Sequence, residues 1–447
     1  MHSHNLNTLL AHADHAAATA TEHATHAGPS VTPGLTLSTT YTQPVPADLV
    51  SLIAAAEREV DGSELNNGHA AMTRPPYVYS RYGSPVVDRV EAVLGALEGA
   101  YAQEGDQVHA VVYASGLTAI HAAISVYKPT RIISAVGYHG TAAAIAEYVT
   151  NRPTTVHARV DPLALVALAS SPNAALPAAL AAISDPAHTV VIVETPANPL
   201  GTILPLAAIA SRLPTGTHLV VDGTLAPPPL QYALSIRGVS AVMHSATKYL
   251  GGHSDLLAGV VAVHDPNVAS ALRASRGTLG GAPGAMEAWL LLRSVRTLGV
   301  RVKAQVAGAA ALAKWLEGAR TGQVKGIAAG AVSAVHHGSI STIEEASWVA
   351  AQMPGGHSPV LSVELASAAA ARALPHVLKL ATAATSLGGV ETLVEWRRQH
   401  DNGVSDKLVR VSVGIEDASD LIADWDRAIR VAVRVGELAA SSSSSVQ

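Results

Sequence analysis

Short apolar runs alternate with helical segments through most of the chain, and this alternation predicts an α/β fold. Helical spacing of apolar residues is present in residues 85–97 and 117–126, and an Ala-rich helix is expected after residue 141. Unalternated apolar runs between such helices indicate a mostly parallel sheet covered by helices on both faces. The predicted strands are residues 108–113, 131–136, 189–194, 218–222, 239–244 and 259–264.

The last third of the chain has a different pattern, which predicts a smaller α+β domain. The pattern in residues 285–317 predicts one long helix or two joined helices. Four charged residues are expected to point into solvent there: Arg293, Arg296, Arg301 and Lys303. Residues 320–358 predict loops around short elements. Residues 359–365 and 408–413 alternate as strands do, and helices are expected at 367–383 and 418–438.

The predicted organisation has four parts. An N-terminal arm, residues 1–78, includes a short helix at 48–60 and a loop at 61–76. The α/β domain follows at 79–297, the α+β domain at 298–440, and a disordered Ser-rich tail at 441–447.

Composition excludes several classes of protein. The 447 residues carry a net charge of −5 without a basic block, so neither nucleic acid nor a membrane surface is an expected partner. No apolar stretch is long enough to span a bilayer, and no secretory signal is visible, so a cytoplasmic location is expected. The absence of Cys excludes disulfides and Cys-ligated zinc. No carboxylate cluster or second half-site accompanies the six histidines in residues 1–30, so a polar, partly disordered arm is preferred to a metal site.

Polar side chains follow five of the predicted strands at their carboxyl ends. In parallel sheets ligands bind outside these ends. One such residue is routine turn chemistry, but five together predict a ligand site at one edge of the sheet. The residues concerned are Ser115-Gly116, Tyr138, Asn198, Asp222 and Ser245-Ala-Thr-Lys248.

Lys248 is the candidate nucleophile. It lies in an apolar stretch with no acidic residue within six positions, and burial favours the neutral amine that forms a Schiff base. A surface lysine on a turn is the alternative. Asp222 ends a strand 26 residues earlier, and its alternative role is a cap. Pyridoxal 5'-phosphate (PLP) is a cofactor that forms an imine with a lysine and needs a carboxylate beside its ring nitrogen, so Lys248 and Asp222 together suit it.

The remaining candidates suit the rest of that cofactor. Ser115-Gly116-Leu117 opens a helix, where free N–H groups and the helix dipole favour a phosphate. Ser245 and Thr247 could add hydroxyl groups, and Tyr138 could stack on the ring. Each residue alone could equally be a cap or a packed side chain.

Several segments in order resemble the Cys/Met-metabolism PLP enzymes, the family of cystathionine γ-synthase and cystathionine lyase. The lysine segment Ser245-Ala-Thr-Lys248-Tyr-Leu-Gly-Gly-His-Ser-Asp255 resembles that family's signature. The further matching segments are Tyr79-Ser-Arg81-Tyr-Gly-Ser-Pro85, Ser115-Gly116-Leu117-Thr-Ala-Ile, Glu194-Thr-Pro-Ala-Asn198-Pro, Val221-Asp222-Gly-Thr224, Ser386-Leu-Gly-Gly-Val-Glu-Thr and Arg410-Val-Ser-Val-Gly-Ile-Glu-Asp.

The resemblance implies PLP as cofactor, the PLP-dependent transferase fold type I, and a role for each matching residue. Lys248 would form the imine and act as acid and base, with Tyr138 stacking on the ring and assisting deprotonation of the substrate amine. Ser386 and Arg410 would hold the substrate carboxylate. The cofactor-binding set would be Tyr79, Arg81, Gly116, Leu117, Tyr138, Asn198, Asp222, Thr224, Ser245, Thr247 and Lys248. Tyr79 and Arg81 would reach a neighbouring subunit's phosphate, which implies a homo-oligomer, a dimer of dimers. No metal is implied.

The chain departs from the family's usual pattern at a few positions. The departures are Ser84, His139, Gly223, Thr385 and residues 393–401, where the usual Met-Thr-His stretch is missing. They leave the cofactor set intact and alter the segments that set substrate specificity.

Three hypotheses follow for the activity. The first is a trans-sulfuration enzyme that acts on a sulfur amino acid such as cystathionine as a C–S lyase, by β- or γ-elimination. The second is γ-replacement on an O-acylhomoserine with a thiol or carbon nucleophile. The third is a non-catalytic scaffold. A dinucleotide-binding dehydrogenase is set aside because no Gly-x-Gly-x-x-Gly follows a strand.

Overall fold

The computed structural model describes residues 34–43, 46–61, 77–101, 107–170, 173–340 and 347–444. The His-rich segment of residues 1–30 and nearly all of the predicted loop at 61–76 lie outside these ranges, so the predictions made for them stay predictions.

The larger of the two sheets carries the candidate site. Within the described ranges it has seven strands in the order β1-β7-β6-β5-β4-β2-β3. All neighbours are parallel except β7, which runs antiparallel to both β1 and β6. The strands are β1 (His109–Tyr113), β2 (Arg131–Ala135), β3 (Val156–Arg159), β4 (Thr189–Glu194), β5 (His218–Asp222), β6 (Val239–Ser245) and β7 (Gly259–Val263). The six predicted strands are confirmed. The edge strand β3 was not predicted, because its partly exposed residues do not form an apolar run.

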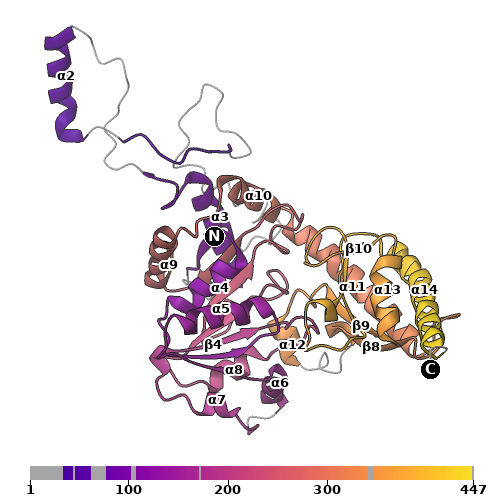
Figure 1. Cartoon of the computed structure of the whole chain (residues 1–447). Helices are drawn as coiled ribbons and strands as arrows, with labels where there is room; N and C mark the ends of the chain where they lie inside the picture. Colours follow the sequence, from indigo (N-terminus) through magenta and orange to yellow (C-terminus); the bar gives the residue numbers. More distant parts are fainter. Residues whose placement is uncertain are drawn as a thin grey trace.

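Helices cover both faces of this sheet because successive side chains of each strand point to opposite sides. Ile132 of β2 packs among α4, α5 and α9, whereas Ile133 packs among α6, α7 and α8. On the latter face, α3 and α10 cover β1 and β7 (Figure 1). These helices are α3 (Pro85–Glu98), α4 (Gly116–Ser125), α5 (His139–Thr150), α6 (Pro162–Ser170), α7 (Ala178–Ala181), α8 (Leu206–Arg212), α9 (Pro266–Leu279) and α10 (Ala285–Val295).

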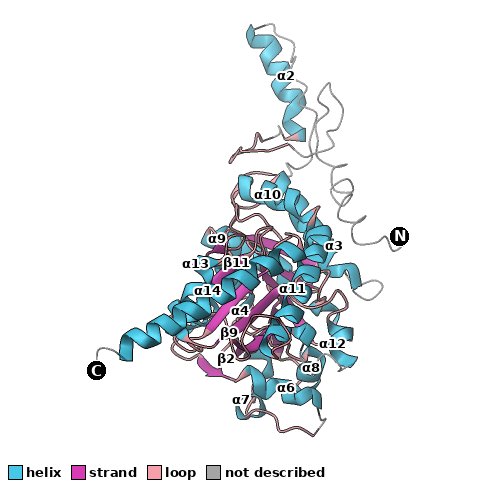
Figure 2. Cartoon of the chain, turned by 90° about the vertical axis from the view of Figure 1, so that its right-hand side faces the viewer, coloured by secondary structure: helices cyan, strands magenta, loops and turns pink. Residues whose placement is uncertain are grey.

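A second sheet lies in the C-terminal part, in the order β10-β11-β12-β9-β8. It packs against α11, α13 and α14, with Trp425 of α14 fully buried between them (Figure 2). The elements are α11 (Leu298–Arg320), β8 (Val332–His336), α12 (Ser347–Gln352), β9 (Val360–Leu365), α13 (Ala368–Val377), β10 (Thr382–Ala383), β11 (Leu393–Trp396), β12 (Leu408–Ser412) and α14 (Ala418–Ser444). The predicted fold class, a mostly parallel α/β sheet with a smaller α+β part, is confirmed.

Some predicted boundaries are wrong. The helix predicted at 367–383 ends at Val377, because the next free N–H groups, those of Lys379 and Leu380, bind the carboxylate of Asp424 on α14. The segment 320–358, in contrast, contains the short elements β8 and α12 between loops, as predicted. Residues 441–444 of the predicted disordered tail continue α14.

The predicted arm helix is present as α2 (Ala47–Asp61), which stands apart from the rest of the chain (Figures 1 and 2). The predicted domain boundaries stay predictions. Among the described residues, no helix combines the length and apolar character needed to cross a membrane.

Arg301 on α11 is buried, which corrects its predicted position in solvent. Its Nη1 donates to the carbonyl oxygen of Tyr249 at 2.8 Å, and its Nη2 donates to that of Ser294 at 3.0 Å. Its Nε donates to the hydroxyl of Thr297 at 3.1 Å. Burial lowers the pKa of Arg301 to about 10. The carbonyl oxygens of the turn that follows Lys248 therefore depend on one guanidinium from the other part of the chain.

We expect Arg301→Met to lower the free energy of unfolding by roughly 2–4 kcal/mol, because buried carbonyl oxygens lose their donors. Lys303→Met, on an exposed position of the same helix, is the matched control and should change stability by less than about 0.5 kcal/mol. Chemical denaturation of the two variants measures the difference. Equal stability of both variants would contradict the structural role of Arg301.

Candidate active site

One cavity of about 700 Å³ opens at the carboxyl ends of the large sheet. The ends of β1, β2, β4, β5 and β6 all contribute to it, as the sequence pattern predicted. Residues from the C-terminal part close its other side. Of the predicted site residues, the cavity is lined by Gly116, Leu117, Tyr138, Asn198, Asp222, Thr224, Ser245, Thr247, Lys248, Ser386 and Arg410.

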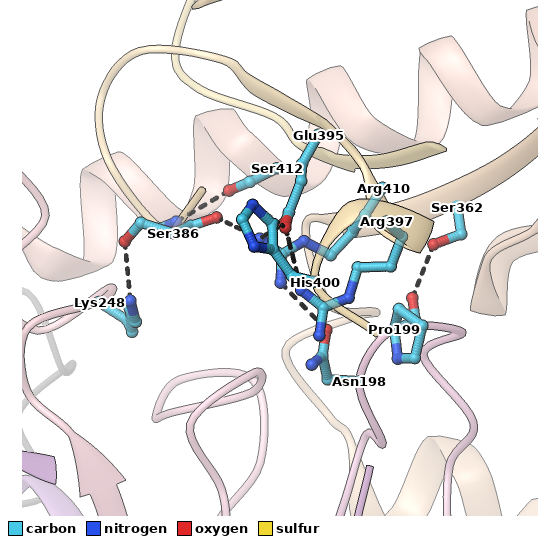
Figure 3. Close-up of polar contacts among 11 residues, drawn as sticks. Asn198, Pro199, Lys248, Ser362, Ser386, Glu395, Arg397, His400, Arg410 and Ser412 are labelled. Carbon is cyan, nitrogen blue, oxygen red and sulfur yellow. Dashed lines mark hydrogen bonds and ion pairs between the residues drawn. The ribbon is translucent and has the colours of Figure 1, made fainter. Parts of the chain in front are cut away.

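Lys248 lies half-buried in this cavity, directly after β6. Its Nζ donates a hydrogen bond of 2.7 Å to the hydroxyl of Ser386 (Figure 3). Burial lowers the pKa of Lys248 to about 8, with a further lowering by Arg410 and an opposing effect of Glu395. An amine with this pKa exchanges its proton close to neutral pH, as an imine-forming lysine must.

Asp222 ends β5 next to β6 and is buried. Burial raises the pKa of Asp222, while hydrogen bonds from Thr224 and the charge of His244 lower it. The Thr224 N–H donates to Oδ1 of Asp222 at 3.0 Å, and the Thr224 hydroxyl accepts from the Ser245 N–H at 2.9 Å. Thr224 therefore links the carboxylate to the strand that carries Lys248.

The N-terminus of α4 forms one wall of the cavity. Ser115 caps this helix by accepting a hydrogen bond from the Thr118 N–H at 3.1 Å. A Cβ on Gly116 would lie 2.8 Å from Cβ of Ser245, so only glycine allows β6 to approach the helix this closely. The result is a narrow cradle of N–H groups and hydroxyl groups suited to a phosphate. The hydroxyl of Thr247, however, already donates to the carbonyl oxygen of Ala258 at 3.2 Å.

Glu194, at the end of β4, organises the loops above the sheet. Its Oε2 accepts from the N–H groups of Gly137 and Tyr138 at 2.7 and 2.8 Å, and its Oε1 accepts from the Asn198 N–H at 3.0 Å. Burial and Asp222 raise its pKa to about 8, against the effect of these donors. Glu194 lies in one of the matching sequence segments, but no role was predicted for it. A carboxylate that ends an otherwise apolar strand was the available signal.

Arg410 and Ser386 lie together, as predicted for a carboxylate site. Arg410 donates from Nη1 to Oδ1 of Asn198 at 3.1 Å and from Nη2 to the carbonyl oxygen of Ser386 at 2.7 Å. Ser386 has a φ of 87°, a left-handed conformation that is uncommon for a residue other than glycine. In this conformation its carbonyl oxygen meets Arg410 while its hydroxyl meets Lys248.

An acidic partner of Arg410 was missed. Glu395 of β11 lies opposite Arg410 of β12 in the antiparallel register, and its Oε2 is 2.7 Å from Nη2 of Arg410. Glu395 also binds Arg397, and all of these residues line the cavity (Figure 3). The short strand β11 was not recognised in the sequence, so this cross-strand pair could not be anticipated.

Tyr79 and Arg81 are not brought to this cavity. Arg81 donates from Nη1 to the carbonyl oxygen of Gly277 at 2.6 Å and lies 4.4 Å from the ring centre of Tyr82. Tyr79 is 41% exposed. Within the described part of the chain, no three His, Asp or Glu side chains are grouped as metal ligands.

The fold and this site define a PLP-dependent enzyme of fold type I. The chain belongs to the family described as Cys/Met metabolism PLP-dependent enzyme, whose model matches residues 16–430. It is 31% identical over 366 residues to cystathionine beta-lyase of Lactococcus lactis subsp. cremoris, and 33% identical over 373 residues to cystathionine gamma-synthase of Escherichia coli K12. Each match covers 79% of this chain and 88% of the relative. The crystal structure of a methionine gamma lyase from Micromonospora echinospora superimposes with a TM-score of 0.75 at 29% identity, over 96% of this chain and all of the other.

Proposed function

We propose that the chain is a carbon–sulfur lyase that acts on a sulfur amino acid of the cystathionine type. The observation that carries this proposal is the Lys248–Ser386 hydrogen bond in the cavity that Asp222 and Arg410 also line. The similarity to a cystathionine beta-lyase supports the lyase reaction. The similarity to a cystathionine gamma-synthase keeps γ-replacement on an O-acylhomoserine as the second candidate.

The residues present fit PLP. The cradle at Gly116 suits its phosphate, the half-buried amine of Lys248 suits its carbonyl carbon, and the buried carboxylate of Asp222 suits its ring nitrogen. Tyr138 would stack on the ring, and Asn198 would contact the ring oxygen. The proposed phosphate ligands are Gly116, Leu117, Ser245 and Thr247, with Thr224 supporting Asp222.

Bound PLP supplies an electron sink that acidifies the Cα hydrogen of the substrate. Arg410 holds the α-carboxylate and so fixes the direction of the Cα–H bond. Lys248 takes that proton at Nζ, and the Ser386 hydroxyl keeps Nζ in place. Tyr138 assists by taking a proton from the substrate amine, for which its position at the cavity wall is suitable.

Loss of the Cα proton lets the electron pair of that bond expel sulfur from Cβ, and the sulfur leaves as a thiol after taking up a proton. Alternatively, after taking the Cα proton, Lys248 can remove a second proton, from Cβ, and this permits loss of sulfur from Cγ. In both cases water hydrolyses the remaining unsaturated amine to a keto acid and ammonia.

A two-substrate assay tests the proposal. We expect L-cystathionine alone to give a keto acid, ammonia and a thiol amino acid, and the keto acid produced distinguishes cleavage at Cβ from cleavage at Cγ. O-acetylhomoserine with a thiol should give little thioether. A thioether product without ammonia would favour the synthase and contradict the lyase.

We also propose that the enzyme is a homo-oligomer, a dimer of dimers, in which Tyr79 and Arg81 complete the site of a neighbouring subunit. Their position away from the cavity of their own chain supports this arrangement. Sedimentation velocity of the purified protein is the direct test, and a monomer would exclude a shared site.

A further inference from the structure

The segment that departs from the family pattern, residues 393–401, forms part of the cavity wall. Glu395, Arg397 and His400 from this segment line the same cavity as Lys248 and Arg410. The mechanism proposed above uses none of the three.

Arg397 is a buried cation with an unfilled hydrogen-bonding edge. Its side chain is 4% exposed, and its Nη1 donates to Oε1 and Oε2 of Glu395 at 3.1 and 3.3 Å. Among the described residues, its Nε and Nη2 have no hydrogen-bond partner. Each buried donor left without a partner is costly, so a ligand that supplies acceptors here would be favoured.

The geometry of the unfilled edge suits a carboxylate. Nε and Nη2 form the side of a guanidinium that binds two oxygen atoms in parallel. Glu395 occupies the Nη1 side, between Arg397 and Arg410 (Figure 3). A carboxylate on the unfilled edge is therefore a different group from one held by Arg410.

The charges around Arg397 favour an additional anion. Arg397 and Arg410 share the single carboxylate of Glu395, which leaves one positive charge in the cluster. His400 also lies close, with Nε2 4.0 Å from Oε1 of Glu395. The other carboxylates of the cavity, Asp222 and Glu194, end strands of the large sheet.

We propose that Arg397 binds a second carboxylate at the far end of the substrate side chain. The enzyme then selects amino acids whose side chain ends in a group with a second carboxylate, such as cystathionine, over those without one, such as methionine. This inference rests on the proposed function, in which Arg410 takes the α-carboxylate.

Two unreactive ligands of equal length test this subsite. L-2-aminoadipate ends in a carboxylate and L-norleucine ends in a methyl group, and titration of the holoenzyme by calorimetry and by the cofactor absorbance gives the Kd of each. We expect the wild type to bind L-2-aminoadipate about 10- to 100-fold more tightly. Arg397→Met should abolish the preference, and Arg397→Lys should retain part of it.

Arg398→Met is the matched control. The Arg398 side chain donates to the carbonyl oxygens of Asn402 and Val404, and Arg398 is not among the residues that line the cavity. This variant should keep the wild-type preference. If Arg397→Met does not fold, Arg397→Lys still tests the point, because an ammonium group cannot bind a carboxylate through two parallel N–H groups.

Two results would overturn the inference: equal or absent binding of the two ligands by the wild type, or a preference that survives in Arg397→Met, including survival with an equal loss of affinity for both ligands. Such an equal loss would place Arg397 on the α-carboxylate. Failure of the proposed function has a different signature, since L-2-aminoadipate would still be preferred while cystathionine gave no keto acid.

Discussion

Lys248→Ala is expected to lower kcat/KM for cystathionine by about 10⁴-fold or more, because it removes both the imine-forming amine and the proposed proton carrier. The variant should also lose the absorbance near about 420 nm that an imine of PLP with a lysine produces. Steady-state assays of keto acid release and absorbance spectra of the purified proteins measure the two effects separately.

The control for charge and expression is Lys303→Ala, on an exposed position of α11. It should retain both the absorbance and the activity. Borohydride should reduce the imine in the wild type and in the control and leave PLP covalently attached, but should attach none to Lys248→Ala. Cofactor reduced onto another lysine in that variant would contradict the assignment.

The sequence predicted the sheet side of the cavity because that side follows from local patterns. Short apolar runs end in Tyr138, Asn198, Asp222 and Lys248, and parallel strands necessarily bring their carboxyl ends to one edge. The direction of each strand, by contrast, could not be predicted from local patterns. The apolar run that forms β7 has the same pattern as the neighbouring runs, yet β7 pairs antiparallel with β1 and β6. The pattern could not predict this pairing, because an apolar run is the same in either direction.

The other side of the cavity depends on pairings between distant residues, which local patterns do not encode. Glu395 and Arg410 meet only through the β11–β12 register, and Lys248 meets Ser386 across 138 positions of the chain. In the sequence, Arg301 resembles a solvent-exposed charge on an Ala-rich helix. In the structure it is buried and donates a hydrogen bond to a carbonyl oxygen of the turn after Lys248. A charged residue is placed in solvent by default, and only its partners reveal that it is buried.

Asp222→Ala is expected to lower kcat for cystathionine by roughly 10²- to 10³-fold and to weaken PLP binding. The physical reason is the loss of the only proposed partner for the protonated ring nitrogen. Asp222 is buried, so water cannot replace its charge. Measurement of kcat at saturating cofactor, together with the Kd of PLP from absorbance titration, separates loss of electron withdrawal from loss of cofactor.

A cofactor analogue methylated at the ring nitrogen provides the decisive control for this variant. Its ring keeps a positive charge without a carboxylate partner, so it should restore a measurable part of the activity to Asp222→Ala while giving no gain to Lys248→Ala. Thr224 should matter less than Asp222, because its N–H and hydroxyl only support the carboxylate and Ser245. Thr224→Ala, which keeps the N–H, should therefore lower kcat by about tenfold or less. If Asp222→Ala retained wild-type kcat with normal PLP, the ring nitrogen would have a different partner, and the buried carboxylate would serve only to hold the turn between β5 and β6.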